Sequence, residues 1–221
     1  THNVSSAASD VYKRQVYGVA RDLAAAGIGE LKQIELPKIK IGSKSPMNVM
    51  FEEANDEKNY CPAFGSRYIK NVKNCESPQW LKDKLNSIGL KPISALVDIT
   101  NYILFDYNRP LHVYDADKVS GNIIIRSAKK DEKFFGLDDK EYSLNEGMCV
   151  IADEKKSLGL GGILGGSSSA CDIATTNILL ESALFIPSNI ANTGRKLFID
   201  SDARYRFERG VDPNSLNIGL D

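Results

Sequence analysis

The chain has 221 residues, of which 42% are hydrophobic, 26% charged and 8% aromatic, a composition typical of a globular domain and unlike that of disordered, fibrous or membrane proteins. Its 28 basic and 29 acidic residues give a net charge of −1, so any contact with a nucleic acid must be local. No apolar run approaches the ~18 residues of a membrane span, and no charged leader followed by an apolar run predicts export. The four cysteines, Cys61, Cys75, Cys149 and Cys171, form no CxxC pair, which disfavours a zinc site and favours a reducing, cytoplasmic compartment.

The N-terminal part of the chain divides into segments of different character. Residues 1–15 are small and polar with no apolar period, and they resemble translated sequencing-adapter sequence. We expect this segment to be non-native or disordered. A helical pattern begins abruptly at Val16, and a linker is predicted over residues 37–48, where Pro37, Gly42 and several lysines separate short apolar steps.

Two helices are predicted after a strand that alternates over residues 67–72. The first begins with Ser77 as N-cap and Pro78 in its first turn, and it ends at Gly89. Its apolar face consists of Leu81, Leu85 and Ile88. The second helix is predicted over residues 94–104. One of its faces carries Leu96, Ile99 and Ile103, and another carries Asp98, Asn101 and Tyr102.

Short strands dominate the remainder of the chain. After a loop around His112, strands are predicted at residues 123–125, 133–135, 141–144 and 149–152, and a longer one at 177–185 before a helix opened by Pro187. Helices and strands do not alternate regularly. The prediction is therefore an α+β fold, with mixed or antiparallel sheets and flanking helices.

The glycine-rich segment 159–167 does not fit a phosphate-binding loop. A dinucleotide fingerprint needs glycine where Leu164 stands, and a P-loop needs lysine where Ser167 stands. Two interpretations remain open: close approach of the backbone to a ligand, and tight turns between strands.

Two polar residues are candidate catalytic or binding residues. His112 and His2 are the two histidines of the chain, and a lone histidine such as His112 is more often structural than catalytic. Glu181 interrupts an apolar strand, and a carboxylate buried there is unfavourable by several kcal/mol unless it is hydrogen-bonded. Strand alternation alone leaves open whether Glu181 points outward or inward.

Six ordered segments indicate a family. They are Cys61-Pro62, Asp98-Ile99-Thr100-Asn101-Tyr102, Pro110-Leu111-His112-Val113-Tyr114-Asp115, Gly161-Gly162-Ile163-Leu164-Gly165-Gly166, Leu179-Leu180-Glu181-Ser182-Ala183 and Arg206-Phe207-Glu208-Arg209-Gly210-Val211-Asp212-Pro213. On these segments the chain resembles the beta subunit of bacterial phenylalanyl-tRNA synthetase, in the B3/B4 region that carries an editing site. The resemblance assigns residues 49–213 to this domain, 16–36 to the tail of the preceding domain and 214–221 to the start of a linker.

Some positions depart from the family pattern. Ala63 and Arg109 stand where the family usually has arginine and glutamine, and residues 200–204 read Asp-Ser-Asp-Ala-Arg instead of His-Thr-Asp-Ala-Ser. The family's Asn-Arg-Pro segment before Tyr17 is missing as well.

The resemblance implies a function in aminoacyl-tRNA quality control. A pocket for phenylalanine rejects tyrosine only weakly, whereas a site that hydrogen-bonds the tyrosine hydroxyl rejects phenylalanine by about 10⁴ to 10⁵. The family therefore hydrolyses misacylated tyrosyl-tRNA at a second site. By position, Glu181 would bind the phenol, and Gly165 would allow close approach. Ser201 and Ala203 would form walls, and Thr100, Asn101 and His112 would orient the ester and its water.

The resemblance also implies partners. These are tRNA and an alpha subunit in an α2β2 enzyme of the cytoplasm, with ATP and magnesium used by the whole enzyme and no cofactor or metal in this chain. Two alternatives stay open: a tRNA- or subunit-binding module whose editing pocket has decayed, with Ala63, Ser201 and Arg204 as signs, and a free-standing hydrolase.

Overall fold

The computed structural model describes residues 16–32, 36–37, 39–40, 42–52 and 60–221. Residues 1–15, for which the sequence predicts a non-native or disordered terminus, lie outside the described residues. The described helices are α2 (Val16–Ala25), α3 (Gln79–Ser87), α4 (Ala95–Tyr107), α5 (Pro187–Leu197), α6 (Asp202–Phe207) and α7 (Ser215–Leu220). The strands are β1 (Val49–Phe51), β2 (Ala63–Ile69), β3 (Leu111–Asp115), β4 (Ile123–Ser127), β5 (Glu132–Phe135), β6 (Glu141–Leu144), β7 (Cys149–Ala152), β8 (Ser157–Leu160), β9 (Leu164–Gly165) and β10 (Ile178–Leu184).

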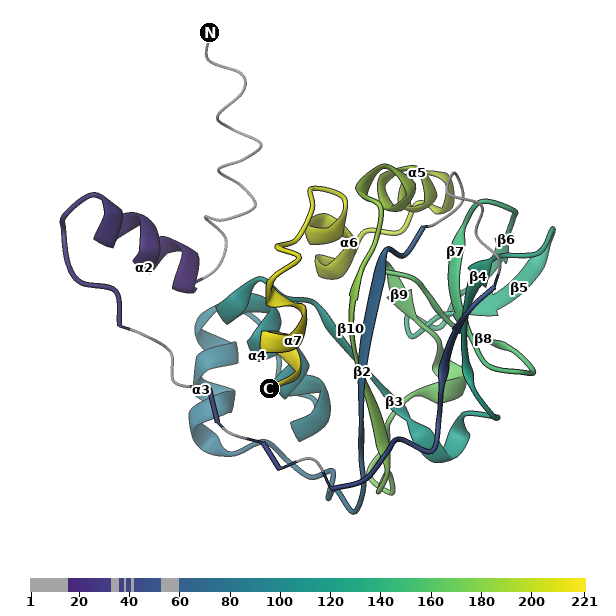
Figure 1. Ribbon diagram of the computed structural model, residues 1–221, viewed down its shortest axis with the longest axis horizontal. Coiled ribbons are helices and arrows are strands. Elements are labelled where there is room, and N and C mark those ends of the chain that lie inside the picture. The colour runs from purple at the N-terminus through teal and green to yellow at the C-terminus, as the bar shows by residue number, and fades with distance from the viewer. Residues whose placement is uncertain (1–15, 33–35, 38, 41, 53–59) are drawn as a thin grey trace, which may run out of the picture.

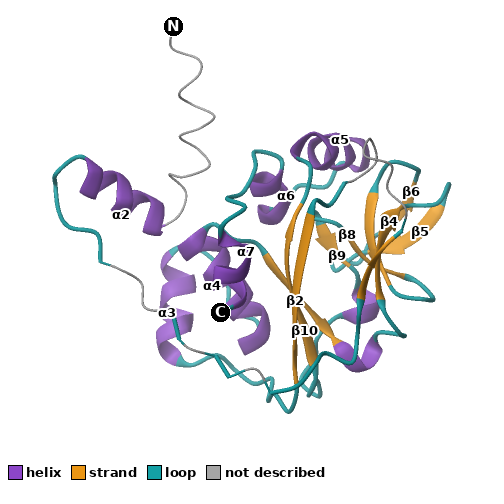
Figure 2. Cartoon of the chain, in the orientation of Figure 1, coloured by secondary structure: helices purple, strands orange, loops and turns teal. Residues whose placement is uncertain are grey.

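These strands form two sheets and a hairpin (Figure 2). The larger sheet has the order β1-β4-β7-β8-β9, in which β1 pairs parallel with β4 and the other pairs are antiparallel. The smaller sheet, β2-β10-β3, is antiparallel, and β5 and β6 form the hairpin. The predicted α+β class with mixed and antiparallel sheets is confirmed.

The smaller sheet is covered on both faces. Helices α4 and α7 pack on one face, and the larger sheet lies toward the other (Figure 1). Leu179 and Ala183 of β10 belong to the core cluster shared with the larger sheet. Glu181 lies between these two residues in the alternation of the strand, so it points to the same inner side. The opposite face of β10 is not open to solvent either, because α7 packs on it.

The two predicted helices form with altered details. Helix α3 begins one residue later than predicted, with Pro78 as its N-cap, and Gly89 has the left-handed φ of +82° expected after a helix end. Leu81 and Leu85 are buried, but Ile88 is 47% exposed, so the predicted apolar face is one residue too long.

The predicted polar face of the second helix is wrong at one position. Asp98 is fully buried, whereas its neighbour Ile99 is 49% exposed. The carboxylate of Asp98 accepts hydrogen bonds from the Ser77 hydroxyl at 2.5 Å and from the Ile93 backbone N–H at 2.8 Å. These bonds offset the desolvation of the charge and join α4 to the preceding segment.

Both ends of the described chain contact the body of the fold. Tyr17 of α2 stacks on Tyr107 of α4 with 6.2 Å between ring centroids. Residues 214–221, for which the sequence predicts the start of a linker, include α7, which packs on β10 and β2. Gly65 permits this contact, because an added Cβ there would lie 2.6 Å from Leu216. Within the described residues, no helix is long and apolar enough to cross a bilayer.

Candidate functional site

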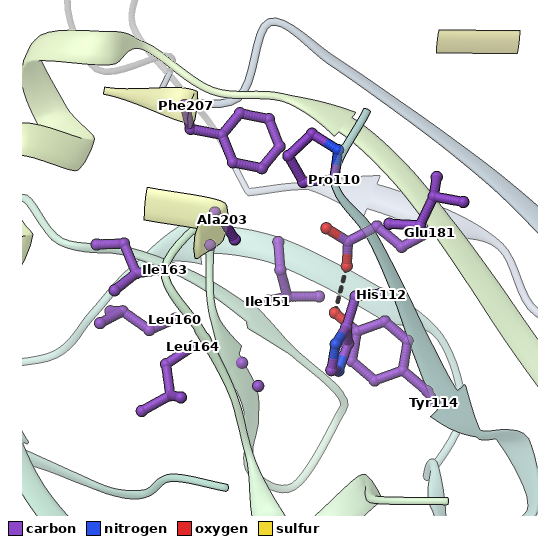
Figure 3. A pocket seen from close by; sticks show the side chains of 15 residues that line it. Pro110, His112, Tyr114, Ile151, Leu160, Ile163, Leu164, Glu181, Ala203 and Phe207 are labelled. Atoms are coloured by element: carbon purple, nitrogen blue, oxygen red, sulfur yellow. Dashed lines mark hydrogen bonds between the residues drawn. The ribbon is translucent and has the colours of Figure 1, made fainter. Parts of the chain in front are cut away.

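A pocket lies between the two sheets, and helix α6 covers part of it (Figure 3). Its empty volume of about 430 Å³ includes space that is open to solvent. Its walls are mostly apolar. The lining residues are Pro110, Leu111, His112, Tyr114, Ile151, Gly159, Leu160, Gly161, Gly162, Ile163, Leu164, Gly165, Glu181, Ala203 and Phe207.

The glycine-rich segment supplies one wall as a β8–turn–β9 hairpin. Gly162 in this turn has φ +69°, a conformation that L residues rarely adopt. Gly165 lies against the imidazole of His112, and an added Cβ would be 2.3 Å from its Cε1 atom. The interpretation as a tight turn between strands is therefore confirmed, and Gly165 leaves room for a pocket side chain, while close approach of the backbone to a ligand stays a prediction.

Glu181 provides the carboxylate of the pocket. Its side chain is 6% exposed, and its Oε2 atom accepts a short hydrogen bond from the Tyr114 hydroxyl (Figure 3). Burial raises the pKa of Glu181 to about 7, while the bond from Tyr114 opposes this rise. Among the described residues, no hydrogen bond to Oε1 is seen, and this atom is not among the buried polar atoms without a partner. The pocket therefore contains a carboxylate oxygen that can accept a bond from a ligand.

His112 lies in strand β3 and not in the predicted loop. The sequence pattern of residues 109–115 is too short to reveal this strand, which depends on pairing with β10. In that pairing His112 stands directly opposite Glu181. Its ring packs edge-on against Tyr114 with 4.5 Å between centroids. Burial lowers the pKa of His112 to about 4, so its imidazole is neutral near pH 7.

Some of the predicted site residues lie elsewhere. Thr100 and Asn101 are on α4, which packs on the other face of the smaller sheet, and neither lines the pocket. The Thr100 hydroxyl donates to the Val97 carbonyl of its own helix at 2.8 Å. The structure thus does not place these two residues in the pocket lining with His112 and Glu181, and their role in orienting the ester stays a prediction.

Ser201 and Ala203 of the same predicted set are separated by the structure. Ala203 lines the pocket. Ser201 does not, but its hydroxyl donates to the Ile163 carbonyl at 2.6 Å and accepts from the Arg204 N–H as the N-cap of α6. Ser201 therefore holds the glycine-rich turn against the helix that carries Ala203.

The positions that depart from the family pattern also lie outside the pocket lining. Arg109 is fully buried and donates to Ser215 Oγ and to the carbonyls of Ala183 and Asp212, at 2.8–2.9 Å. Arg204 donates to the Ile199 carbonyl and to Glu208. Ala63 is the first residue of β2. These side chains support the backbone around the site.

Several lining residues escaped the sequence analysis. Tyr114 and Phe207 are the clearest examples. Tyr114 follows His112 by two positions, a spacing that places two side chains on one face of a strand, so recognition of β3 would have found it. Among the residues that the structure describes, no three His, Cys, Asp or Glu side chains form a group that could hold a metal ion.

Comparisons with known proteins define the class. A model of the B3/4 domain family matches residues 60–221, so the chain belongs to the B3/4 domain family. It is 50% identical over 206 residues to the phenylalanine–tRNA ligase beta subunit of Mesorhizobium japonicum, and 55% identical over 198 residues to that of Paramagnetospirillum magneticum. These matches cover 93% and 90% of the chain. The resemblance drawn from the sequence is confirmed.

The chain spans 25% of the length of each of these two relatives. A solved structure, an N-terminal fragment of the phenylalanyl-tRNA synthetase beta subunit from Pyrococcus horikoshii, superposes with a TM-score of 0.50 and 18% identity. The superposition covers 79% of this chain and 53% of that fragment. At this identity it supports the fold alone.

Proposed function

We propose that this chain serves as the editing region of a phenylalanine–tRNA ligase beta subunit and hydrolyses misacylated tyrosyl-tRNA. The observation that carries the proposal is Glu181, a buried carboxylate with a free oxygen in a pocket whose walls are mostly apolar. Apolar walls such as Ile151 and Phe207 suit an aromatic ring. A phenol donating to Oε1 of Glu181 gains a charge-assisted bond, while a phenyl ring leaves the charge without this partner.

The proposed chemistry is direct attack of water on the ester. His112, neutral near pH 7 and next to Glu181, would orient the ester or the attacking water through its imidazole nitrogens. Gly165 would keep the imidazole in place, and Ala203 would form the opposite wall. Thr100 and Asn101 lie outside the pocket lining, and no step of this arrangement is assigned to them.

The remaining partners belong to the proposal as well. We propose a cytoplasmic enzyme that contains an alpha subunit, acts on tRNA, and uses ATP and magnesium to attach phenylalanine. No residue of this chain is proposed as a ligand of ATP or magnesium. A decayed pocket is less well supported, because Ala63, Ser201 and Arg204 lie outside the lining.

The test is a deacylation assay on tyrosyl-tRNA and phenylalanyl-tRNA, using this chain and a complete phenylalanine–tRNA ligase that carries it. Wild-type protein should hydrolyse tyrosyl-tRNA preferentially. Glu181→Ala should reduce this preference about ten- to a hundredfold, since a hydrogen bond to a charged group contributes about 1.5–3 kcal/mol. The matched control is Glu141→Ala, because Glu141 is an exposed carboxylate of the β5–β6 hairpin paired with Lys133. Hydrolysis no faster than the rate without protein, or a preference unchanged in Glu181→Ala, would contradict the proposal.

A further inference from the structure

Tyr114 lines the pocket and contacts both His112 and Glu181, but the proposed reaction assigns it no role. Its side chain is 1% exposed, its ring packs on His112, and its hydroxyl donates to Oε2 of Glu181. We propose that Tyr114 is a positioning residue that fixes the carboxylate of Glu181 so that the other oxygen selects an aromatic substrate with a hydroxyl group. This inference rests on the proposed function and deepens it.

The backbone holds the two side chains in a fixed relation. In the antiparallel pairing of β10 with β3, Glu181 is opposite His112, and Leu179 is opposite Tyr114. Tyr114 is therefore the diagonal neighbour of Glu181 on the inner face, a separation that an aromatic side chain can bridge. Since β10 is paired on both sides, neither residue can move away without disturbing the ladder.

The hydrogen bond from Tyr114 makes the two carboxylate oxygens of Glu181 inequivalent. Oε2 is occupied by Tyr114, and Oε1 turns away from Tyr114, toward the side of the pocket where Figure 3 shows Pro110. A carboxylate without this anchor can rotate about its terminal bond, which has a broad torsional preference. Tyr114 thus converts a mobile acceptor into one with a fixed direction.

Tyr114 also maintains the charge. The titratable groups around Glu181 are His112 and Tyr114 of β3, Cys149 of β7, and Cys61. The thiol pKa values are raised by burial, and the pKa of His112 is lowered by it, so none of these groups is charged near pH 7. Among the described residues, Tyr114 is the hydrogen-bond donor that opposes protonation of Glu181.

Removal of this hydroxyl therefore has a definite consequence. In Tyr114→Phe, the carboxyl group of Glu181 loses its donor and stays protonated to higher pH. A neutral, rotating acid binds a phenol less strongly and opposes a phenyl ring less. We expect the preference for tyrosyl- over phenylalanyl-tRNA to fall about tenfold at pH 7, in proportion to the loss of one charge-assisted bond. The pH midpoint of the preference should move upward by about one unit, which corresponds to that tenfold effect.

Tyr142→Phe is the matched control. The Tyr142 hydroxyl also donates to a carboxylate, that of Asp138 at 2.5 Å, but it lies in the β5–β6 hairpin and outside the pocket lining. Both variants would be assayed for the two deacylation rates between about pH 5 and pH 9 in the complete enzyme. The pKa of Glu181 would be measured by carbon-13 NMR of its carboxyl group, with Glu181→Gln identifying the signal. The control should leave the preference, its midpoint and the Glu181 pKa unchanged.

Clear outcomes overturn the inference. One is a folded Tyr114→Phe protein with wild-type preference and midpoint, and another is a variant with increased preference, because the hydroxyl would then compete with the substrate. If Tyr114→Phe does not fold, 3-fluorotyrosine at position 114, a stronger donor of the same shape, should lower the midpoint, and an unchanged midpoint refutes the positioning role. If wild-type protein does not deacylate tyrosyl-tRNA, the proposed function fails, and the NMR pKa alone decides whether Tyr114 controls Glu181.

Discussion

The pair formed by His112 and Glu181 predicts an unusual dependence of stability on pH. Burial raises the pKa of Glu181 from 4.5 to about 7 and lowers that of His112 from 6.5 to about 4. Between about pH 4.5 and 7 the folded protein keeps a proton on Glu181 that the unfolded chain has lost, so the free energy of unfolding falls as pH rises. Between about pH 4 and 6.5 the unfolded chain protonates His112 while the folded protein does not, so this contribution rises with pH.

The pH dependences that the two residues give to the free energy of unfolding are similar in size and opposite in direction. Each shift spans about 2.5 pH units, and one unit corresponds to ~1.4 kcal/mol, which gives at most about 3.5 kcal/mol for each residue. The contribution of His112 is expected to be somewhat smaller, because its side chain is only partly buried. In the wild-type protein the two changes of unfolding free energy with pH largely cancel over this range.

Substituting either Glu181 or His112 alone makes the pH dependence contributed by the other residue visible. As pH rises from 4.5 to 7, the stability of Glu181→Gln relative to wild type should increase by up to about 3.5 kcal/mol; as pH rises from 4 to 6.5, the stability advantage of His112→Asn over wild type should decrease by a similar or smaller amount. Urea denaturation at a series of pH values measures the free energy of unfolding for the three proteins. Differences from wild type cancel the contributions of other titrating groups, such as Glu132 and Asp172, whose pKa values are lowered by their basic partners. A constant difference between Glu181→Gln and wild type across this range would refute the reasoning, since it would mean that the pocket does not disfavour the charge.

Two further predictions concern the frame of the site. Gly165→Ala should displace the imidazole of His112, slow deacylation and reduce stability by about 1–3 kcal/mol, whereas Gly29→Ala, whose added Cβ would have no neighbour within 4 Å and which lies outside the pocket lining, should have little effect in the same two assays. Arg109→Met should lower the free energy of urea unfolding by about 2–4 kcal/mol, because it leaves buried oxygens without donors. Arg195→Met, on the exposed side of α5, should change this free energy by less than about 0.5 kcal/mol. Equal effects of the two substitutions would contradict the role given to Arg109.

The sequence alone determined the helices and strands whose ends are set by signals within a few neighbouring residues. Strands β6 (Glu141–Leu144) and β7 (Cys149–Ala152) have the predicted bounds, and α5 begins at Pro187 as expected. These segments are marked by turn residues, by β-branched or aromatic side chains, or by proline in the first helical turn, and such signals act over a few residues. The family segments likewise predicted the class of protein.

The tertiary structure alone decided which side chains meet. Strand β3 exists because it pairs with β10, almost 70 residues further along the chain. Glu181 shares the inner face of β10 with Leu179 and Ala183, and because both faces of this strand are covered, alternation could not separate an inner from an outer face. The same sheet brings Tyr114 to Glu181, because a contact between distant segments is fixed by strand order and register, which no local pattern encodes.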